Sequence, residues 1–98
     1  MRRTKTYSEE LSRRLRKPSY AQEFLASLME GPEGLSAEDA LRQTIGIMGV
    51  KEFSKLAGVS APNIVAFVKG RRNLKPESLD QLLKPFKLRT RIVFERAS

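Results

Sequence analysis

A three-residue turn that begins with Gly58 separates two short runs of the chain, residues 50–57 and 61–69, whose apolar residues recur at helical spacing. Ser54 lies four positions before this glycine, and Gly70 suits the left-handed position that closes the second run. Glycine takes a positive φ at no steric cost, and a small residue lets two helices cross closely. The chain is therefore predicted to contain two short helices joined by a tight corner. Their predicted inward residues are Val50, Phe53, Leu56, Ala57, Ile64, Phe67 and Val68.

Two helices are predicted before this pair. Thr6 or Ser8 can cap the first, whose early turn is acidic and whose last turn is basic, as the helix dipole favours. Pro18 should end it. Ser19, with Gln22 three residues later, forms a capping-box pattern that predicts the start of the second helix, and a Gly-Pro-Glu-Gly sequence then stops that helix. The predicted inward residues are Tyr7, Leu11, Leu15, Phe24, Leu25 and Leu28.

Two more helices are predicted on either side of the corner. Ser36 and Asp39 repeat the cap-plus-acid pattern and predict the start of a third helix, which should end at Gly49. Pro76, at a first helical position, predicts the start of a last helix that Pro85 should end or bend. The residues at helical spacing in these two helices are Ala37, Leu41, Thr44, Ile45, Met48, Leu79, Leu82, Leu83 and Phe86, all apolar except Thr44.

The C-terminal residues follow a different period. From Leu88 to Glu95 the apolar residues alternate and β-branched residues are common, which predicts a strand. A strand needs a partner for its backbone groups, and two are available: residues 3–7, which also alternate, or the same strand in a second copy. We favour pairing across a dimer two-fold, with residues 3–7 as an addition. The predicted fold is thus mainly α, with five to six helices and a short C-terminal β-strand paired in a dimer.

Composition restricts the chemistry available to the chain. The 98 residues include no cysteine and no histidine, so the commonest general base, the commonest metal ligands and the thiol nucleophile are all missing. We therefore expect no enzyme, no cofactor and no metal site. The basic N-terminus is not followed by an apolar core, and no apolar run reaches membrane-spanning length, so a cytoplasmic protein that does not bind membranes is expected.

Charge is organised by segment. The net charge is +8, and basic residues exceed acidic ones by seven to two in residues 1–17 and by eleven to four in residues 51–98. Residues 18–50 carry one arginine and five acidic residues. Basic charge gathered on parts of a small domain is typical of proteins that bind nucleic acid.

The second half of the chain resembles the Cro/repressor-type helix-turn-helix family. The match runs from Val50 without a gap through FSKLAGVSAPNIVAFVKGRRNLKPESLDQLLKPFKL, including the Gly-Arg-Arg loop and the Pro-Glu-Ser-Leu opening of the next helix. Together with LRKPSYAQEFLASLME, EDALRQTIGIMGV and LRTRIVF, the whole chain is similar to the HigA-like antitoxins of type II toxin–antitoxin pairs. Ser54 stands where that pattern usually has alanine, and Lys87 stands where glycine is common.

This resemblance implies an arrangement of segments and a function. Residues 36–87 would form the helix-turn-helix domain, residues 1–35 a helical extension, and residues 88–98 a dimerising strand. Such antitoxins repress their own operon as homodimers on double-stranded DNA and neutralise a RelE/ParE-like toxin. Two alternatives stay open: a stand-alone regulator without a toxin, and a toxin-binding module with little operator specificity.

The candidate DNA-binding residues surround the corner. Ser60 is the natural N-cap of the second helix, and Asn63 is the one side chain on its outward face suited to a bidentate contact, preferably with adenine. The small apolar residues beside Asn63 can only pack on a thymine methyl group, while the lysines and arginines suit phosphates, and Arg71 and Arg72 also suit a narrow minor groove. The full set is Lys51, Lys55, Ser60, Ala61, Pro62, Asn63, Ala66, Lys69, Arg71, Arg72 and Lys75.

Overall fold

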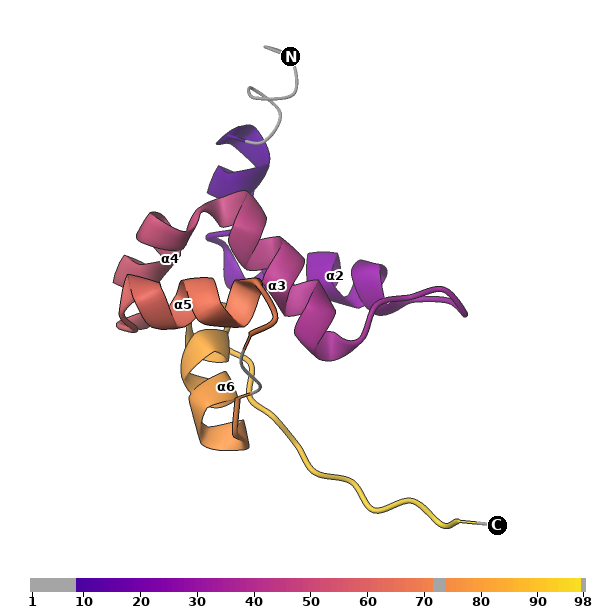
Figure 1. Cartoon of the computed structure of the whole chain (residues 1–98). Helices are drawn as coiled ribbons and strands as arrows, with labels where there is room; N and C mark the ends of the chain where they lie inside the picture. Colours follow the sequence, from indigo (N-terminus) through magenta and orange to yellow (C-terminus); the bar gives the residue numbers. More distant parts are fainter. Residues whose placement is uncertain (1–8, 72–73, 98) are drawn as a thin grey trace.

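The computed structural model describes residues 9–71 and 74–97, and these residues are mainly helical, as predicted (Figure 1). Residues 9–14 are helical and are called the N-terminal helix below. The elements that follow are α2 (Pro18–Met29), α3 (Ala37–Met48), α4 (Val50–Ala57), α5 (Ala61–Val68), α6 (Pro76–Leu83) and a short 3-10 helix, η1 (Lys84–Phe86).

Several helix boundaries confirm the sequence predictions. The Asp39 amide N–H donates to the Ser36 hydroxyl oxygen over 3.1 Å, so Ser36 caps α3. Gly49 ends α3 and separates it from α4. Pro76 is the first residue of α6, which ends at Leu83 and is followed by η1, the 3-10 turn that contains Pro85. These signals act within one turn of the chain, and the structure follows each of them.

The predicted capping box of the second helix is wrong. The helix begins at Pro18 with Lys17 in the N-cap position, so Ser19 lies inside the first turn. Proline is well suited to a first helical position, because its φ is already helical and its missing N–H would have no partner there. The Gln22 side chain instead donates to the Phe86 carbonyl oxygen over 3.0 Å and joins α2 to η1.

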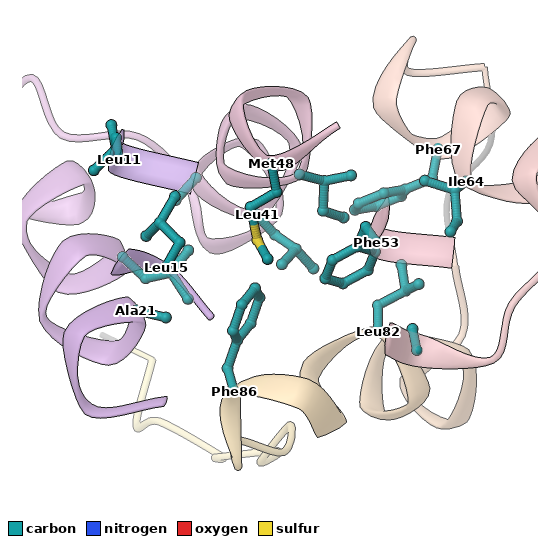
Figure 2. Close-up of a cluster of buried hydrophobic side chains, with 14 residues drawn as sticks. Leu11, Leu15, Ala21, Leu41, Met48, Phe53, Ile64, Phe67, Leu82 and Phe86 are labelled. Carbon is teal, nitrogen blue, oxygen red and sulfur yellow. The ribbon is translucent and has the colours of Figure 1, made fainter. Parts of the chain in front are cut away.

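The core is a single cluster of apolar side chains to which every helix contributes (Figure 2). Phe53 from α4 and Phe86 from η1 are both fully buried, with ring centroids 5.7 Å apart. Leu11 and Leu15 are buried as predicted and bring the N-terminal helix into the same cluster. The other buried apolar residues are Ala21, Leu25, Ala40, Leu41, Ile45, Met48, Ala57, Ile64, Phe67 and Leu82.

One predicted inward position is wrong: Leu56 is 46% exposed. Ala37, one of the residues at helical spacing in α3, is also exposed. Helix α4 is only eight residues long and packs through Phe53 and Ala57, which lie one turn apart. Leu56 is about 100° around the helix from Ala57, outside that narrow stripe. Tyr7 lies outside the described residues.

The C-terminal segment is extended but has no strand ladder within the described part of the chain. It leaves η1 through Lys87, which takes the left-handed conformation (φ 57°) at the position where glycine is common. Residues 91–97 then run away from the helices and are exposed throughout (Figure 1). The predicted pairing with residues 3–7 falls on residues outside the described ranges, and pairing with a second copy stays a prediction.

Candidate nucleic-acid interface

The corner between α4 and α5 has the geometry that its sequence predicts. Gly58 adopts the left-handed conformation (φ 69°, ψ 30°), and its N–H donates to the Ser54 carbonyl oxygen over 2.9 Å. The Ser54 hydroxyl donates to the Val59 carbonyl oxygen over 2.6 Å. This serine, at the position where the helix-turn-helix pattern usually has alanine, therefore stabilises the turn. Ile64 and Phe67 are fully buried and hold α5 against the body.

The outward face of α5 presents the predicted small side chains. Pro62 and Asn63 are exposed, and Ala61 and Ala66 are half-buried. Ser60 precedes the helix in an extended conformation, as an N-cap residue should, but its side chain makes no capping hydrogen bond. Pro62 occupies the second helical position and has no N–H to offer, which removes one of the two usual donors for such a bond.

The end of α5 is closed by a Schellman motif. Gly70 (φ 73°) donates its N–H to the Phe67 carbonyl oxygen over 3.0 Å, and the Arg71 N–H donates to the Ala66 carbonyl oxygen over 2.9 Å. This confirms the role predicted for Gly70. The motif directs the chain into the basic loop, of which Arg71 is exposed and Arg72 lies outside the described residues.

Arg42, which is not among the residues predicted from the sequence, contacts the same end of α5 from α3. Its Nε donates to the Phe67 carbonyl oxygen over 2.7 Å, and its guanidinium carbon lies 4.6 Å from the centroid of the Phe67 ring. Asp39 pairs with the same guanidinium over 2.8 Å. A cation at a helix C-terminus is favourable, and here it also orients the predicted recognition helix. The available signal was an isolated arginine three residues after an acid in a segment otherwise free of basic residues.

The described basic candidates are all at the surface around this corner. Lys51 and Lys55 lie one turn apart on α4, and both are exposed. Lys69 follows the end of α5, and Lys75 precedes α6; both are exposed. Asn63 and Lys75 line one cavity of about 320 Å³ between the corner and α6, together with Val59, Leu74, Ser78, Gln81 and Leu82. The structure thus brings Asn63 and Lys75 together, whereas the two α4 lysines do not line this cavity.

The only acidic residue between positions 50 and 71 is neutralised by a neighbour. Glu52 lies in the first turn of α4, and its carboxylate forms an ion pair with the Arg16 guanidinium over 3.5 Å. Both side chains are about half exposed, so the pair stabilises the fold by at most about 1 kcal/mol. Its main effect is electrostatic, because it cancels the one negative charge beside Lys51 and Lys55.

One titratable group departs clearly from its ordinary behaviour. The Asp80 carboxylate on α6 accepts hydrogen bonds from the Thr90 backbone N–H (2.6 Å) and from the Thr90 hydroxyl (2.8 Å). The backbone hydrogen bond, followed by the hydroxyl bond, lowers the pKa of Asp80 below its ordinary value of 3.8, with a smaller contribution from Arg89. This contact fastens the C-terminal segment to α6 just before the segment leaves the body.

Residues 9–71 and 74–97 contain no group of three acidic side chains arranged to hold a metal ion. Within the same ranges, each helix is too short or too polar to cross a bilayer. No protein-family model, curated protein or solved structure matches the chain.

Proposed function

We propose that the protein binds double-stranded DNA through a helix-turn-helix in which α4 crosses the phosphate backbone and α5 enters the major groove. The observation that carries this proposal is the α4–Gly58–α5 corner. It buries Ile64 and Phe67 on one side of α5 and exposes Pro62 and Asn63 on the other. A recognition helix needs this separation, because one face must be rigidly packed while the other meets base edges.

Phosphate contacts supply most of the proposed binding energy. Lys51, Lys55, Lys69, Arg71 and Lys75 are exposed and surround the corner. Asn63 is the side chain suited to reading a base, while Ala61, Pro62 and Ala66 offer only apolar contact. Sequence preference therefore comes mainly from the spacing of two half-sites and from DNA shape.

A homodimer would provide the two half-sites. The extended residues 88–95 keep the alternating pattern of a strand, and Ile92 and Phe94 are 72% and 95% exposed. Pairing of this segment with its copy would satisfy the backbone groups and cover these side chains at the same time. The C-terminal segment is thus the proposed dimerisation element of a cytoplasmic, non-catalytic regulator.

The resemblance to HigA-like antitoxins supports a more specific role, that of an antitoxin which represses its own operon and neutralises a RelE/ParE-like toxin. The second candidate is a toxin-binding module with little operator specificity. It is favoured by the small apolar side chains on the outward face of α5 and by the exposed Leu56. A stand-alone repressor would share the DNA-binding surface but lack the toxin.

Salt dependence tests the proposal. The affinity of the full chain for a duplex from the promoter upstream of its own gene should fall by about 10³-fold or more between roughly 50 and 200 mM salt, as expected for several phosphate contacts. Fluorescence anisotropy with the promoter duplex and a scrambled duplex of equal length measures this fall. A flat response on both duplexes contradicts DNA binding.

Two variants separate base contacts from phosphate contacts. Asn63→Ala should lose about 1–3 kcal/mol on the promoter duplex and little on the scrambled one. Arg71→Ala should weaken binding to both duplexes alike. Equal losses on the two duplexes for Asn63→Ala would show that this residue reads no base.

Co-expression with the product of the neighbouring gene distinguishes the antitoxin from the stand-alone repressor.

A further inference from the structure

The N-terminal helix is packed against the junction between α3 and α4. The Ser12 hydroxyl donates to the Met48 carbonyl oxygen, the last in α3, over 3.3 Å. The Arg16 guanidinium reaches Glu52 in the first turn of α4 over 3.5 Å. Leu11 and Leu15 are buried beneath the same helix. The helix therefore has a fixed place beside the start of α4, as Figure 1 shows for its indigo segment.

The basic residues of this helix and of the turn that follows it divide between two sides. Arg14 pairs with Glu10 over 3.1 Å, and both line a small cavity with Tyr20 of α2. Arg16 points to α4. Arg13 is exposed and lies one turn before Arg16, whose N–H donates to the Arg13 carbonyl oxygen over 3.2 Å. Arg14 is thus directed toward α2 and Arg16 toward α4, while Arg13 is exposed one turn before Arg16.

We propose that Arg13 and Arg16 extend the phosphate-binding surface beyond the helix-turn-helix, with the N-terminal helix as a third element against the backbone of the same duplex. The inference rests on the proposed function, in which α4 crosses the backbone. Arg16 is in contact with the first turn of α4, beside the exposed Lys51. Its guanidinium would therefore lie near the DNA strand whose phosphates α4 contacts.

Charge and geometry identify a phosphate backbone as the occupant of this surface. Arg16 cancels the charge of Glu52, so the start of α4 adds no unpaired acid to the exposed charges of Arg13, Lys51 and Lys55. The Arg16–Glu52 contact runs through one nitrogen of the guanidinium, so its other N–H groups can donate to a phosphate while the pair is kept. The apolar side chains of Leu11 and Leu15 are buried in the core. The described part of this helix therefore has no apolar face that could enter a lipid bilayer.

Three single variants of the full chain test the proposal. Arg13→Gln and Arg16→Gln should each reduce the slope of log affinity against log salt by about 0.9, the value for one lost phosphate contact on duplex DNA. Arg14→Gln removes the same charge from the other side of the same helix and should leave the slope unchanged. Circular dichroism on each variant checks that the helices are retained.

The outcomes are distinguishable. Wild-type slopes for both Arg13→Gln and Arg16→Gln overturn the inference while leaving the helix-turn-helix interface in place. An equal reduction for Arg14→Gln also overturns it, because the effect would then be one of net charge and not of position. Arg13-dependent binding to vesicles containing phosphatidylglycerol, with unchanged duplex binding, would assign the surface to a membrane instead. Absence of any salt-dependent duplex binding by the wild type defeats the proposed function itself.

Discussion

Arg42 helps to position α5, the predicted recognition helix, although it is not one of the candidate DNA-binding residues. Its guanidinium lies on the Phe67 ring and donates to the Phe67 carbonyl oxygen at the end of α5, while Asp39 fixes it from α3. The side chain is only 16% exposed, so these contacts are partly shielded from water. The contacts join the third helix to the predicted recognition helix at the point where the basic loop begins.

Arg42→Met is therefore expected to lower the free energy of unfolding by about 2 kcal/mol. It leaves the Phe67 carbonyl without its charged donor, and it removes both the ring contact and a favourable cation at a helix C-terminus. Urea denaturation of the two proteins measures the difference. Gln43→Met, at the exposed neighbouring position, should change the value by less than about 0.5 kcal/mol. Similar values for both variants would show that Arg42 contributes no more than a surface residue.

At the scale of single elements, the predictions that succeeded depend on interactions within one or two turns of the chain. Ser36 caps its helix, and Gly58 and Gly70 take the left-handed conformation. These features could be predicted because caps and turns depend on residues only a few positions apart. The role of Gln22 could not be predicted in this way. Two start signals overlap at Pro18 and Ser19, and the partner of Gln22 is the carbonyl of a residue 64 positions away.

Candidate site residues follow the same division. The exposed positions of Lys51, Lys55 and Asn63 follow from helical periodicity. The contribution of the N-terminal helix does not, since the Arg16–Glu52 contact depends on how distant helices pack. The C-terminal strand pattern is present in the sequence, but a ladder needs a second strand, and the described part of a single chain supplies none beside it.

The anchoring of the C-terminal segment to α6 depends on pH. Hydrogen bonds from Thr90 lower the pKa of Asp80 in the folded protein below 3.8. A lowered carboxyl pKa contributes stability that is complete above the unfolded value and is lost as the pH falls through the folded value. Asp80→Asn should therefore be less stable than the wild type at neutral pH, and the difference should shrink below about pH 4.

Thermal unfolding of both proteins at a series of pH values follows this difference. Glu77→Gln, on the same helix, serves as the control, because Glu77 is exposed. A stability difference between wild type and Asp80→Asn that stays constant from pH 7 to about pH 3 would contradict the assignment. The effect would then come from packing and not from the ionised carboxylate.

At the scale of the whole molecule, the helices cover one another while the C-terminal segment is left uncovered. Leu88 packs against the core, and Thr90 is held by Asp80. Ile92 and Phe94 continue the same alternation but lie beyond the helical body and are exposed. The side that faces the body at residues 88 and 90 therefore carries exposed apolar side chains at residues 92 and 94.

If this segment forms the dimer contact, replacing these side chains should separate the protomers. The double variant Ile92→Asn, Phe94→Asn is expected to halve the molecular mass measured by light scattering, because it removes the apolar side of the paired strands while leaving the Asp80–Thr90 anchor intact. Val93→Asn, between them on the opposite side, should remain dimeric. DNA affinity should fall with the dimer, since each protomer would then hold only one half-site. A dimeric double variant would place the two-fold contact on the helices, and a monomeric wild type would leave a single corner to bind the duplex alone.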